Sequence, residues 1–113
     1  MMVSRGDIYL ANLNPVKKNN EIGKIRPVVV YQNDELNHSY YPTTIIFPLS
    51  TDLVNEAEPL RMRISKRDNL EKDSDLIVTQ IRAIDNRRLI KKIAKLKKEE
   101  LIKLKQLFDE VVE

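Results

Sequence analysis

The chain has 113 residues, of which 42% are hydrophobic and 33% are charged, so it is long enough for one globular domain and too apolar for a disordered chain. Its formal net charge of +3 permits binding to a polyanion without requiring it. The absence of cysteine excludes disulfide frameworks, thiolate metal sites and cysteine nucleophiles. We therefore predict a single domain over residues 1–113.

The amino-terminal residues lack the basic segment and apolar run that are typical of a signal peptide. No later apolar run approaches the length of a membrane span. We therefore expect a cytoplasmic protein with no membrane partner.

The first half of the sequence predicts three strands. A turn signal at residues 5–7 precedes a β-prone run that ends near Pro15. Residues 27–31 are β-branched with little alternation, which is typical of a strand buried on both faces in the middle of a sheet. The third strand covers residues 43–49, where Pro48 indicates a bulge or a sheet edge.

Polar stretches without periodicity predict the connections between these strands. Residues 17–24 are interpreted as an exposed loop, residues 33–42 as a connection, and residues 51–59 as a second loop.

The second half predicts further strands and one helix. Residues 60–64 alternate apolar and basic side chains, as in a half-exposed strand, and residues 75–84 are β-prone until Asp85-Asn86 ends the run. Residues 89–96 fit either a short strand or the start of a helix, and we favour the strand. From Lys98 onward, apolar residues at helical spacing predict an amphipathic C-terminal helix.

Many short strands followed by one terminal helix predict a mainly β fold, namely a partly closed antiparallel barrel of the SH3-like type with the helix as a cover. The polar face of the helix carries both charge signs, so we expect it to cover the core or a dimer interface rather than a membrane.

Four blocks of sequence occur in a characteristic order and spacing. They are residues 5–16, residues 26–34 beginning with Arg26-Pro27, residues 42–50 and residues 73–85. Together these blocks resemble the MazF/PemK family of toxin endoribonucleases, and the resemblance covers nearly the whole chain. A serine, Ser50, with Thr51 beside it, stands where the family usually has a threonine, and it can make the same hydrogen bonds.

The resemblance implies an SH3-like barrel of the CcdB/MazF type that forms a homodimer. It implies a toxin that causes growth arrest by cleaving single-stranded mRNA at specific sequences, independently of the ribosome, without metal or cofactor. The products implied are 2′,3′-cyclic phosphate and 5′-hydroxyl ends, and the partner implied is a cognate antitoxin. From the residues, we expect the apolar run 45–47 and the C-terminal helix to supply the dimer interface.

The candidate catalytic residues follow from the needs of RNA cleavage by its own 2′-hydroxyl, which are charge stabilisation and proton transfer. Arg26 is the leading candidate, because a guanidinium is always charged and grips two phosphate oxygens at once. Ser50 is expected to bind a phosphate oxygen or orient the reacting group. Glu21 is expected to accept a proton or to position Arg26.

Further residues are candidates for RNA contacts. The set expected to bind RNA backbone or base edges is Lys17, Lys18, Lys24, Thr51 and Gln80. Tyr40 and Tyr41 are candidates for stacking on bases. His38, the only histidine, lies in a polar connection where the resemblance places no catalytic residue, and we expect an ordinary exposed side chain there.

Two alternative functions fit the same fold class. One is a gyrase-binding toxin of the CcdB kind, against which the Arg26-Pro27 block argues. The other is a non-catalytic SH3-like module that binds RNA or peptide, in which Arg26 would affect affinity rather than turnover.

Overall fold

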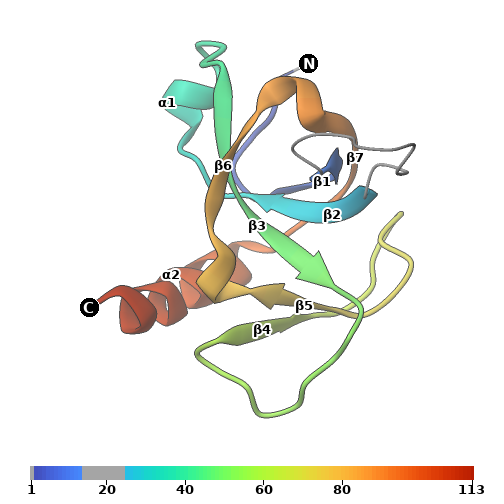
Figure 1. Ribbon diagram of the computed structural model, residues 1–113, viewed down its shortest axis with the longest axis vertical. Coiled ribbons are helices and arrows are strands. Elements are labelled where there is room, and N and C mark those ends of the chain that lie inside the picture. Colours follow the sequence, from blue (N-terminus) through green and yellow to red (C-terminus); the bar gives the residue numbers. More distant parts are fainter. Residues whose placement is uncertain (1, 14–24) are drawn as a thin grey trace, which may run out of the picture.

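A computed structural model describes residues 2–13 and 25–113, and these ranges form a curved β-sheet with a long helix packed against it (Figure 1). The strands are β1 (Asp7–Asn12), β2 (Ile25–Val30), β3 (Thr43–Ser50), β4 (Arg61–Ile64), β5 (Ser74–Ile77), β6 (Arg82–Asp85) and β7 (Leu89–Lys95). The helical elements are α1 (Asp34–Asn37), the 3-10 helices η1 (Val78–Gln80) and η2 (Asn86–Arg88), and α2 (Lys98–Val112).

All strand pairs are antiparallel, in the order β4-β5-β3-β2-β1-β7, and β6 pairs with β3 beside this path. The end strands β4 and β7 do not pair with each other, so the barrel-like sheet stays open. The predicted fold class, an SH3-like antiparallel barrel with an amphipathic C-terminal helix, is confirmed with this refinement.

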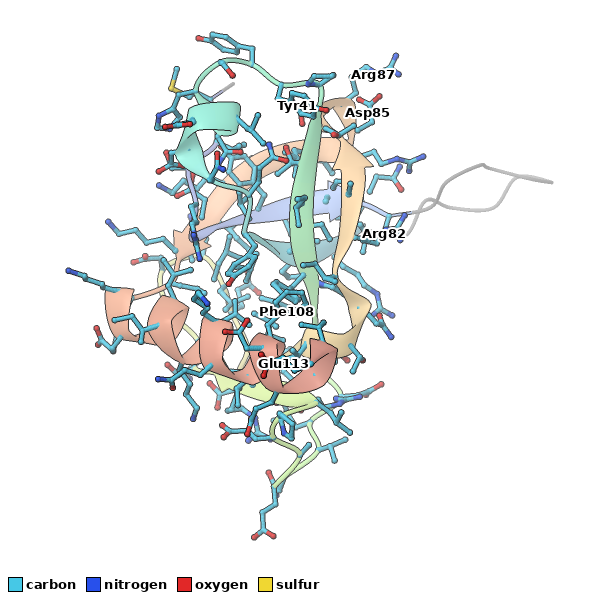
Figure 2. The ribbon with its side chains drawn as sticks, turned by 90° about the vertical axis from the view of Figure 1, so that its left-hand side faces the viewer. Tyr41, Arg82, Asp85, Arg87, Phe108 and Glu113 are labelled. Atoms are coloured by element: carbon cyan, nitrogen blue, oxygen red, sulfur yellow. The ribbon has the colours of Figure 1, made fainter. Side chains whose placement is uncertain are left out.

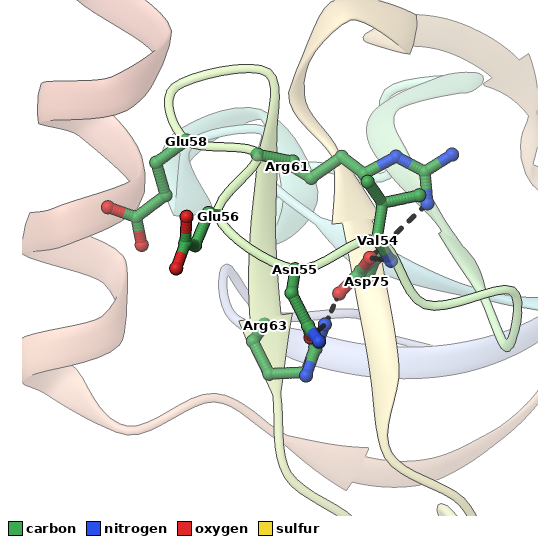
Figure 3. Close-up of a pocket in the computed structure, with 8 residues that line it drawn as sticks. Val54, Asn55, Glu56, Glu58, Arg61, Arg63 and Asp75 are labelled. Atoms are coloured by element: carbon green, nitrogen blue, oxygen red, sulfur yellow. Dashed lines mark hydrogen bonds and ion pairs between the residues drawn. The ribbon is translucent and has the colours of Figure 1, made fainter.

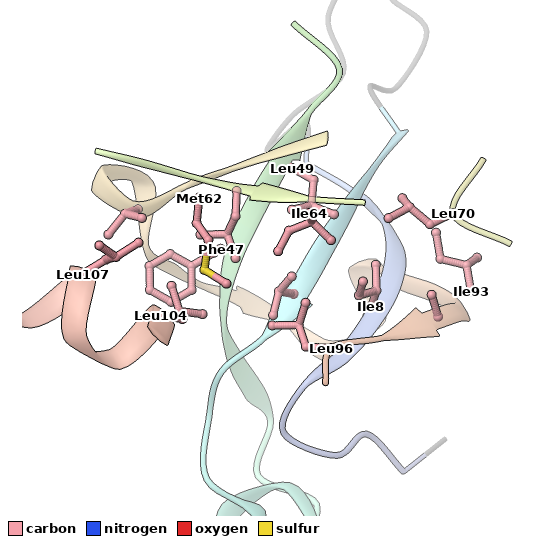
Figure 4. Packing of buried hydrophobic residues seen from close by; sticks show 14 residues of the cluster. Ile8, Phe47, Leu49, Met62, Ile64, Leu70, Ile93, Leu96, Leu104 and Leu107 are labelled. Carbon is pink, nitrogen blue, oxygen red and sulfur yellow. The ribbon is translucent and has the colours of Figure 1, made fainter. Parts of the chain in front are cut away.

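Hydrophobic side chains pack on both faces of the central strands. Val28 and Val29 are adjacent on β2, and neither is exposed to solvent; the first belongs to one buried cluster and the second to the other. β2 lies between β1 and β3, so the prediction of a strand buried on both faces is confirmed. Figure 4 shows the larger cluster, in which side chains of β3, β4 and α2 meet.

The helix α2 closes one side of this larger cluster. Its Leu104 and Leu107 are buried, and Phe108 packs edge-on against Phe47 and Tyr31 with ring centroids 5.6 Å and 6.2 Å away. Such edge-to-face contacts contribute beyond simple area burial. The predicted amphipathic helix is confirmed, and its apolar face is largely used within the chain's own core.

The structure corrects the expectation for Pro48. β3 is a central strand and continues through Pro48, which pairs with Val28. On its other side β3 pairs with β6 up to Ile46 and with β5 from Leu49 onward. Pro48 lies between these two stretches, where no ladder hydrogen bond is required, so the missing N–H group has no cost.

The structure adds detail to two further expectations. The run 75–84 is not one strand, because η1 separates β5 from β6 and lets the chain change its position along β3. The connection 33–42 contains the short helix α1, whose first turn is capped by the side chain of Asn33.

The apolar run 45–47 also differs from the prediction. Ile46 and Phe47 are fully buried in the subunit, and only Ile45, with 36% of its surface exposed, is partly accessible. This run therefore supplies little surface for a dimer interface. Within residues 2–13 and 25–113, no helix is long and apolar enough to cross a membrane.

Candidate functional site

The candidate site is built where β2 begins and β3 ends. Val28 pairs with Pro48 in the antiparallel ladder between these strands. Continuing this register by two residues places Arg26 opposite Ser50, and both side chains then project from the same face. The strand pairing thus brings together two residues that are far apart in the sequence.

Arg26 and Ser50 line a common pocket of about 290 Å³. Its other lining residues are Ile25, Pro27, Leu49, Thr51 and Asp52. Two apolar strand ends and a turn thus surround one guanidinium, two hydroxyl groups and one carboxylate. The guanidinium and the hydroxyl groups are hydrogen-bond donors that can bind the oxygens of a phosphate ester.

Arg26 differs from the other half-buried arginines in its contacts. Four arginines in the described ranges are half-buried, and three of them have protein partners: Arg61 contacts Asp75, Arg67 contacts Glu100, and Arg88 donates to the carbonyl of Asn12. Arg26 has neither a hydrogen bond nor an ion pair with any described residue. A half-buried cation without a protein partner is available for an anionic ligand.

Ser50 is oriented by the turn that follows it. Its Oγ accepts a hydrogen bond from the backbone N–H of Asp52 at 3.1 Å. The hydroxyl hydrogen remains able to donate toward the pocket, since a serine hydroxyl both donates and accepts. Ser50 is half-buried and Thr51 is exposed, so both reach the pocket from the end of β3.

A row of polar residues continues from this pocket across the sheet. Ser50 pairs with Asp75 on β5, and Asp75 pairs with Arg63 on β4. Directly paired residues share a face, so Arg26, Ser50, Asp75 and Arg63 form what we call the polar row. The row lies on the face opposite Leu49 and Leu76, which belong to the larger hydrophobic cluster.

Asp75 is only 1% exposed and is fully engaged by donors (Figure 3). It accepts from Arg63 Nε at 2.6 Å, from the Val54 backbone N–H at 2.8 Å and from Arg61 Nη1 at 3.2 Å. Burial acts to raise the pKa of Asp75, but the hydrogen bonds from Arg63, Val54 and Arg61 outweigh it and hold this pKa below its usual value. The side chain is therefore an ionised, compensated carboxylate.

The remaining candidates from the sequence have different placements. Thr51 lines the pocket, whereas Gln80 is exposed at the end of η1 and does not line it. Glu21, Lys17, Lys18 and Lys24 lie outside the described residues. Their assignments stay predictions.

His38 and the two loop tyrosines lie away from the pocket. His38 is exposed at the end of α1, with its Nε2 3.1 Å from Ser4 Oγ. Tyr40 and Tyr41 line a different hollow of about 230 Å³, and Tyr41 lies with Asp85 and Arg87 at the end of the molecule away from α2 (Figure 2). None of the three lines the pocket of Arg26.

Sequence reasoning missed three residues that the structure connects to the pocket. Asp52 lines it directly, and Asp75 and Arg61 support the turn that follows Ser50. Asp52 follows Ser50-Thr51 closely in sequence and so had a local signal. Asp75 and Arg61 had none, because only the strand register reveals their proximity.

Comparison with known proteins identifies the family of the chain. A model of the PemK-like, MazF-like toxins of type II toxin-antitoxin systems matches residues 4–112. The chain is 41% identical over 110 residues to a protein named endoribonuclease MazF from Staphylococcus epidermidis, covering 96% of this chain and 89% of that protein.

Solved structures share the fold at low sequence identity. A chain of a MazE–MazF crystal structure from Deinococcus radiodurans matches with a TM-score of 0.79 at 15% identity, covering 99% of this chain and 96% of that one. An endoribonuclease in complex with its cognate antitoxin from a mycobacterial species matches with a TM-score of 0.71 at 14% identity, covering 98% and 93%. The family match and the close relative show that this chain belongs to the PemK-like, MazF-like toxins of type II toxin-antitoxin systems.

Proposed function

We propose that the protein is an endoribonuclease that cleaves single-stranded mRNA at specific sequences, without metal and independently of the ribosome. The observation that carries the proposal is the half-buried guanidinium of Arg26, which has no partner among the described residues and shares a pocket with Ser50. The name of the relative from Staphylococcus epidermidis, endoribonuclease MazF, supports the same activity.

The chemistry assigned to this pocket is attack of an RNA 2′-hydroxyl on the adjacent phosphorus. The new P–O2′ bond forms as the P–O5′ bond breaks, the 2′-hydroxyl loses its proton, and the leaving 5′-oxygen gains one. The products are a 2′,3′-cyclic phosphate and a 5′-hydroxyl. Arg26 stabilises the extra negative charge on the phosphorane, and Ser50 donates a hydrogen bond to a phosphate oxygen.

A second hollow, of about 240 Å³, supports a path for the RNA beside this pocket. It shares Pro27 and Thr51 with the pocket of Arg26, and its floor includes the buried side chains of Leu70 and Ile93. Exposed polar side chains at positions 69, 71 and 72 line its rim. Apolar walls with polar edges suit an unstacked base of single-stranded RNA.

The decisive experiment replaces Arg26 and measures RNA cleavage. The purified protein is incubated with a long RNA in EDTA, and the new 5′ ends are mapped. Arg26→Ala should lower the rate at least a hundredfold, since loss of a positioned donor to a developing oxyanion costs about 3 to 4 kcal/mol. Arg26→Lys should recover part of the rate, because lysine keeps the charge but loses the two-pronged grip.

Two comparisons make this experiment conclusive. Arg87→Ala removes the same charge from an arginine that is 90% exposed in its side chain and lies outside the pocket, so it should cleave normally. Thermal unfolding of each variant excludes misfolding as the cause. A folded Arg26→Ala protein that cleaves at the wild-type rate would refute the site assignment. A folded wild-type protein without cleavage would favour gyrase binding or a non-catalytic module.

The proposed partners are a second copy of the chain and an antitoxin. MazE–MazF and toxin–cognate antitoxin structures among the similar folds support an antitoxin partner. We assign an acidic, extended antitoxin segment to the pocket of Arg26, because it would compete with RNA for the same guanidinium. Excess RNA should displace such a segment in a binding assay.

A further inference from the structure

Three successive contacts lead from the buried carboxylate of Asp75 to the hydroxyl of Ser50. Asp75 Oδ2 accepts from Arg61 Nη1 at 3.2 Å, and the same Nη1 donates to the backbone carbonyl of Asp52 at 2.8 Å. The backbone N–H of Asp52 in turn donates to Ser50 Oγ at 3.1 Å. Arg61 thus contacts both the buried carboxylate of Asp75 and the carbonyl of Asp52, and the N–H of Asp52 orients Ser50.

We propose that Arg61, fixed by Asp75, is a positioning residue that orients the hydroxyl of Ser50 toward the substrate phosphate. The inference rests on the proposed function, since it concerns the group assigned to the phosphate oxygen. Arg61 itself lines the neighbouring hollow rather than the pocket of Arg26, so its action on the reaction passes through Asp52.

The position of Ser50 explains why such support is needed. Ser50 is the last residue of β3, and the following residues 51–60 leave the sheet as a turn and loop. A serine hydroxyl oxygen can occupy three staggered positions about the Cα–Cβ bond unless a hydrogen bond selects one rotamer. The N–H of Asp52 makes that selection, and the contact from Arg61 to the carbonyl of Asp52 limits movement of this residue.

Other contacts of the same loop serve as an internal comparison. At the far end of the loop, Lys103 Nζ on α2 contacts Glu58 Oε2 at 2.6 Å. This ion pair tethers the loop to the body of the protein, as Arg61 does, but it has no contact with Asp52 or Ser50. Figure 3 shows Arg61 directed toward Asp75, while Glu58 points to the helix side of the loop.

The experiment compares Arg61→Met with Lys103→Met. Each variant removes one positive charge and one loop tether, so a general loss of RNA attraction or loop order should affect both alike. Arg61→Met should lower kcat about tenfold with little change in KM, because a misoriented donor weakens the transition state more than substrate binding. Lys103→Met should cleave as the wild type does, and Arg61→Lys should regain part of kcat.

A double-mutant cycle then tests whether Arg61 acts through Ser50. In the Ser50→Ala protein, measured by single-turnover cleavage with excess enzyme, adding Arg61→Met should cause no further loss. A full tenfold loss in that background would overturn the proposal, as would equal losses in Arg61→Met and Lys103→Met.

Amide hydrogen exchange gives a readout that does not depend on cleavage. Arg61→Met should speed exchange of the Asp52 N–H, whereas Lys103→Met should leave it unchanged. Unchanged exchange at Asp52 in Arg61→Met refutes the inference even if the protein cleaves RNA. Absence of cleavage by the wild type refutes the proposed function, while faster exchange at Asp52 would still show that Arg61 orders the turn.

Discussion

Replacing Asp75 with asparagine removes one negative charge from a buried position and keeps the size of the side chain. In the native protein this carboxylate is 1% exposed and accepts from Arg63, Arg61 and the N–H of Val54. Asparagine offers one acceptor oxygen instead of two, and its NH₂ group faces donors. At least one of the three donors therefore loses its partner.

The expected loss of stability follows from these contacts. Breaking a buried ion pair by removing one partner costs about 3–5 kcal/mol, and a hydrogen bond to a charged group contributes about 1.5–3 kcal/mol. The arginines keep partial contact with water, with side chains 27% and 40% exposed for Arg61 and Arg63, which reduces the penalty. We expect the free energy of unfolding to fall by about 2–3 kcal/mol, with a drop in Tm on the order of 10 °C.

The effect should depend on pH in a defined direction. The pKa of Asp75 is lowered in the folded protein, although burial opposes this, because the bonds from Arg63, Val54 and Arg61 favour the ionised form. Its stabilisation is therefore complete above the unfolded pKa of about 3.9 and is lost as the pH falls through the lower folded value. The difference between wild type and Asp75→Asn should shrink below about pH 4.

Urea unfolding followed by circular dichroism at several pH values between about 3 and 7 measures this difference. The reasoning is refuted if Asp75→Asn costs less than about 0.5 kcal/mol at pH 7, or if its cost stays constant as the pH falls below 4. Lys105→Met, which removes an exposed ion pair with Asp109, is a control that should change stability little.

Two further predictions concern the amino-terminal turn and the assembly. Gly6→Ala should cost about 1–2 kcal/mol in urea unfolding, because Gly6 has φ +93° and an added Cβ would lie 3.1 Å from Leu101 Cδ1; an unchanged midpoint would contradict this. Light scattering should show a homodimer at micromolar concentration, with exposed Ile45, Ile102 and Val112 as apolar surface for contacts; a monomer would remove the dimer proposal.

The strands with strong local signals were predictable from the sequence. The β-branched run 27–31 and the alternating run 60–64 correspond to β2 and β4. By contrast, the break at η1 and the central position of Pro48 depend on β3 changing partners between β6 and β5. Such exchange of partners is a tertiary property, so no local pattern predicts it.

The candidate site was also predictable only in part, because some of its residues come together through strand pairing alone. Arg26 and Ser50 follow from the resemblance, and the register between β2 and β3 brings them together. Asp75 opens the β-prone run 75–84 and Arg61 lies in the alternating run 60–64, and neither position carries a local signal for the site. Their importance follows from pairings across β3, β4 and β5, which a linear sequence does not display.

The order of charges in the polar row has a consequence for the reaction. Neighbouring strands are about 4.8 Å apart, so Asp75 lies roughly 10 Å from Arg26 and about 5 Å from Ser50. The shorter of these separations is about half the Debye length at about 0.1 M salt, so an uncompensated carboxylate at Asp75 would repel a phosphate bound at Ser50. The ion pairs from Arg61 and Arg63 offset this repulsion, while Arg26 is paired with none of the described residues. Because Arg63 pairs with Asp75 independently of Arg61, the carboxylate keeps a cationic partner when Arg61 is replaced, and the effect of Arg61 on the reaction passes through Asp52 and Ser50.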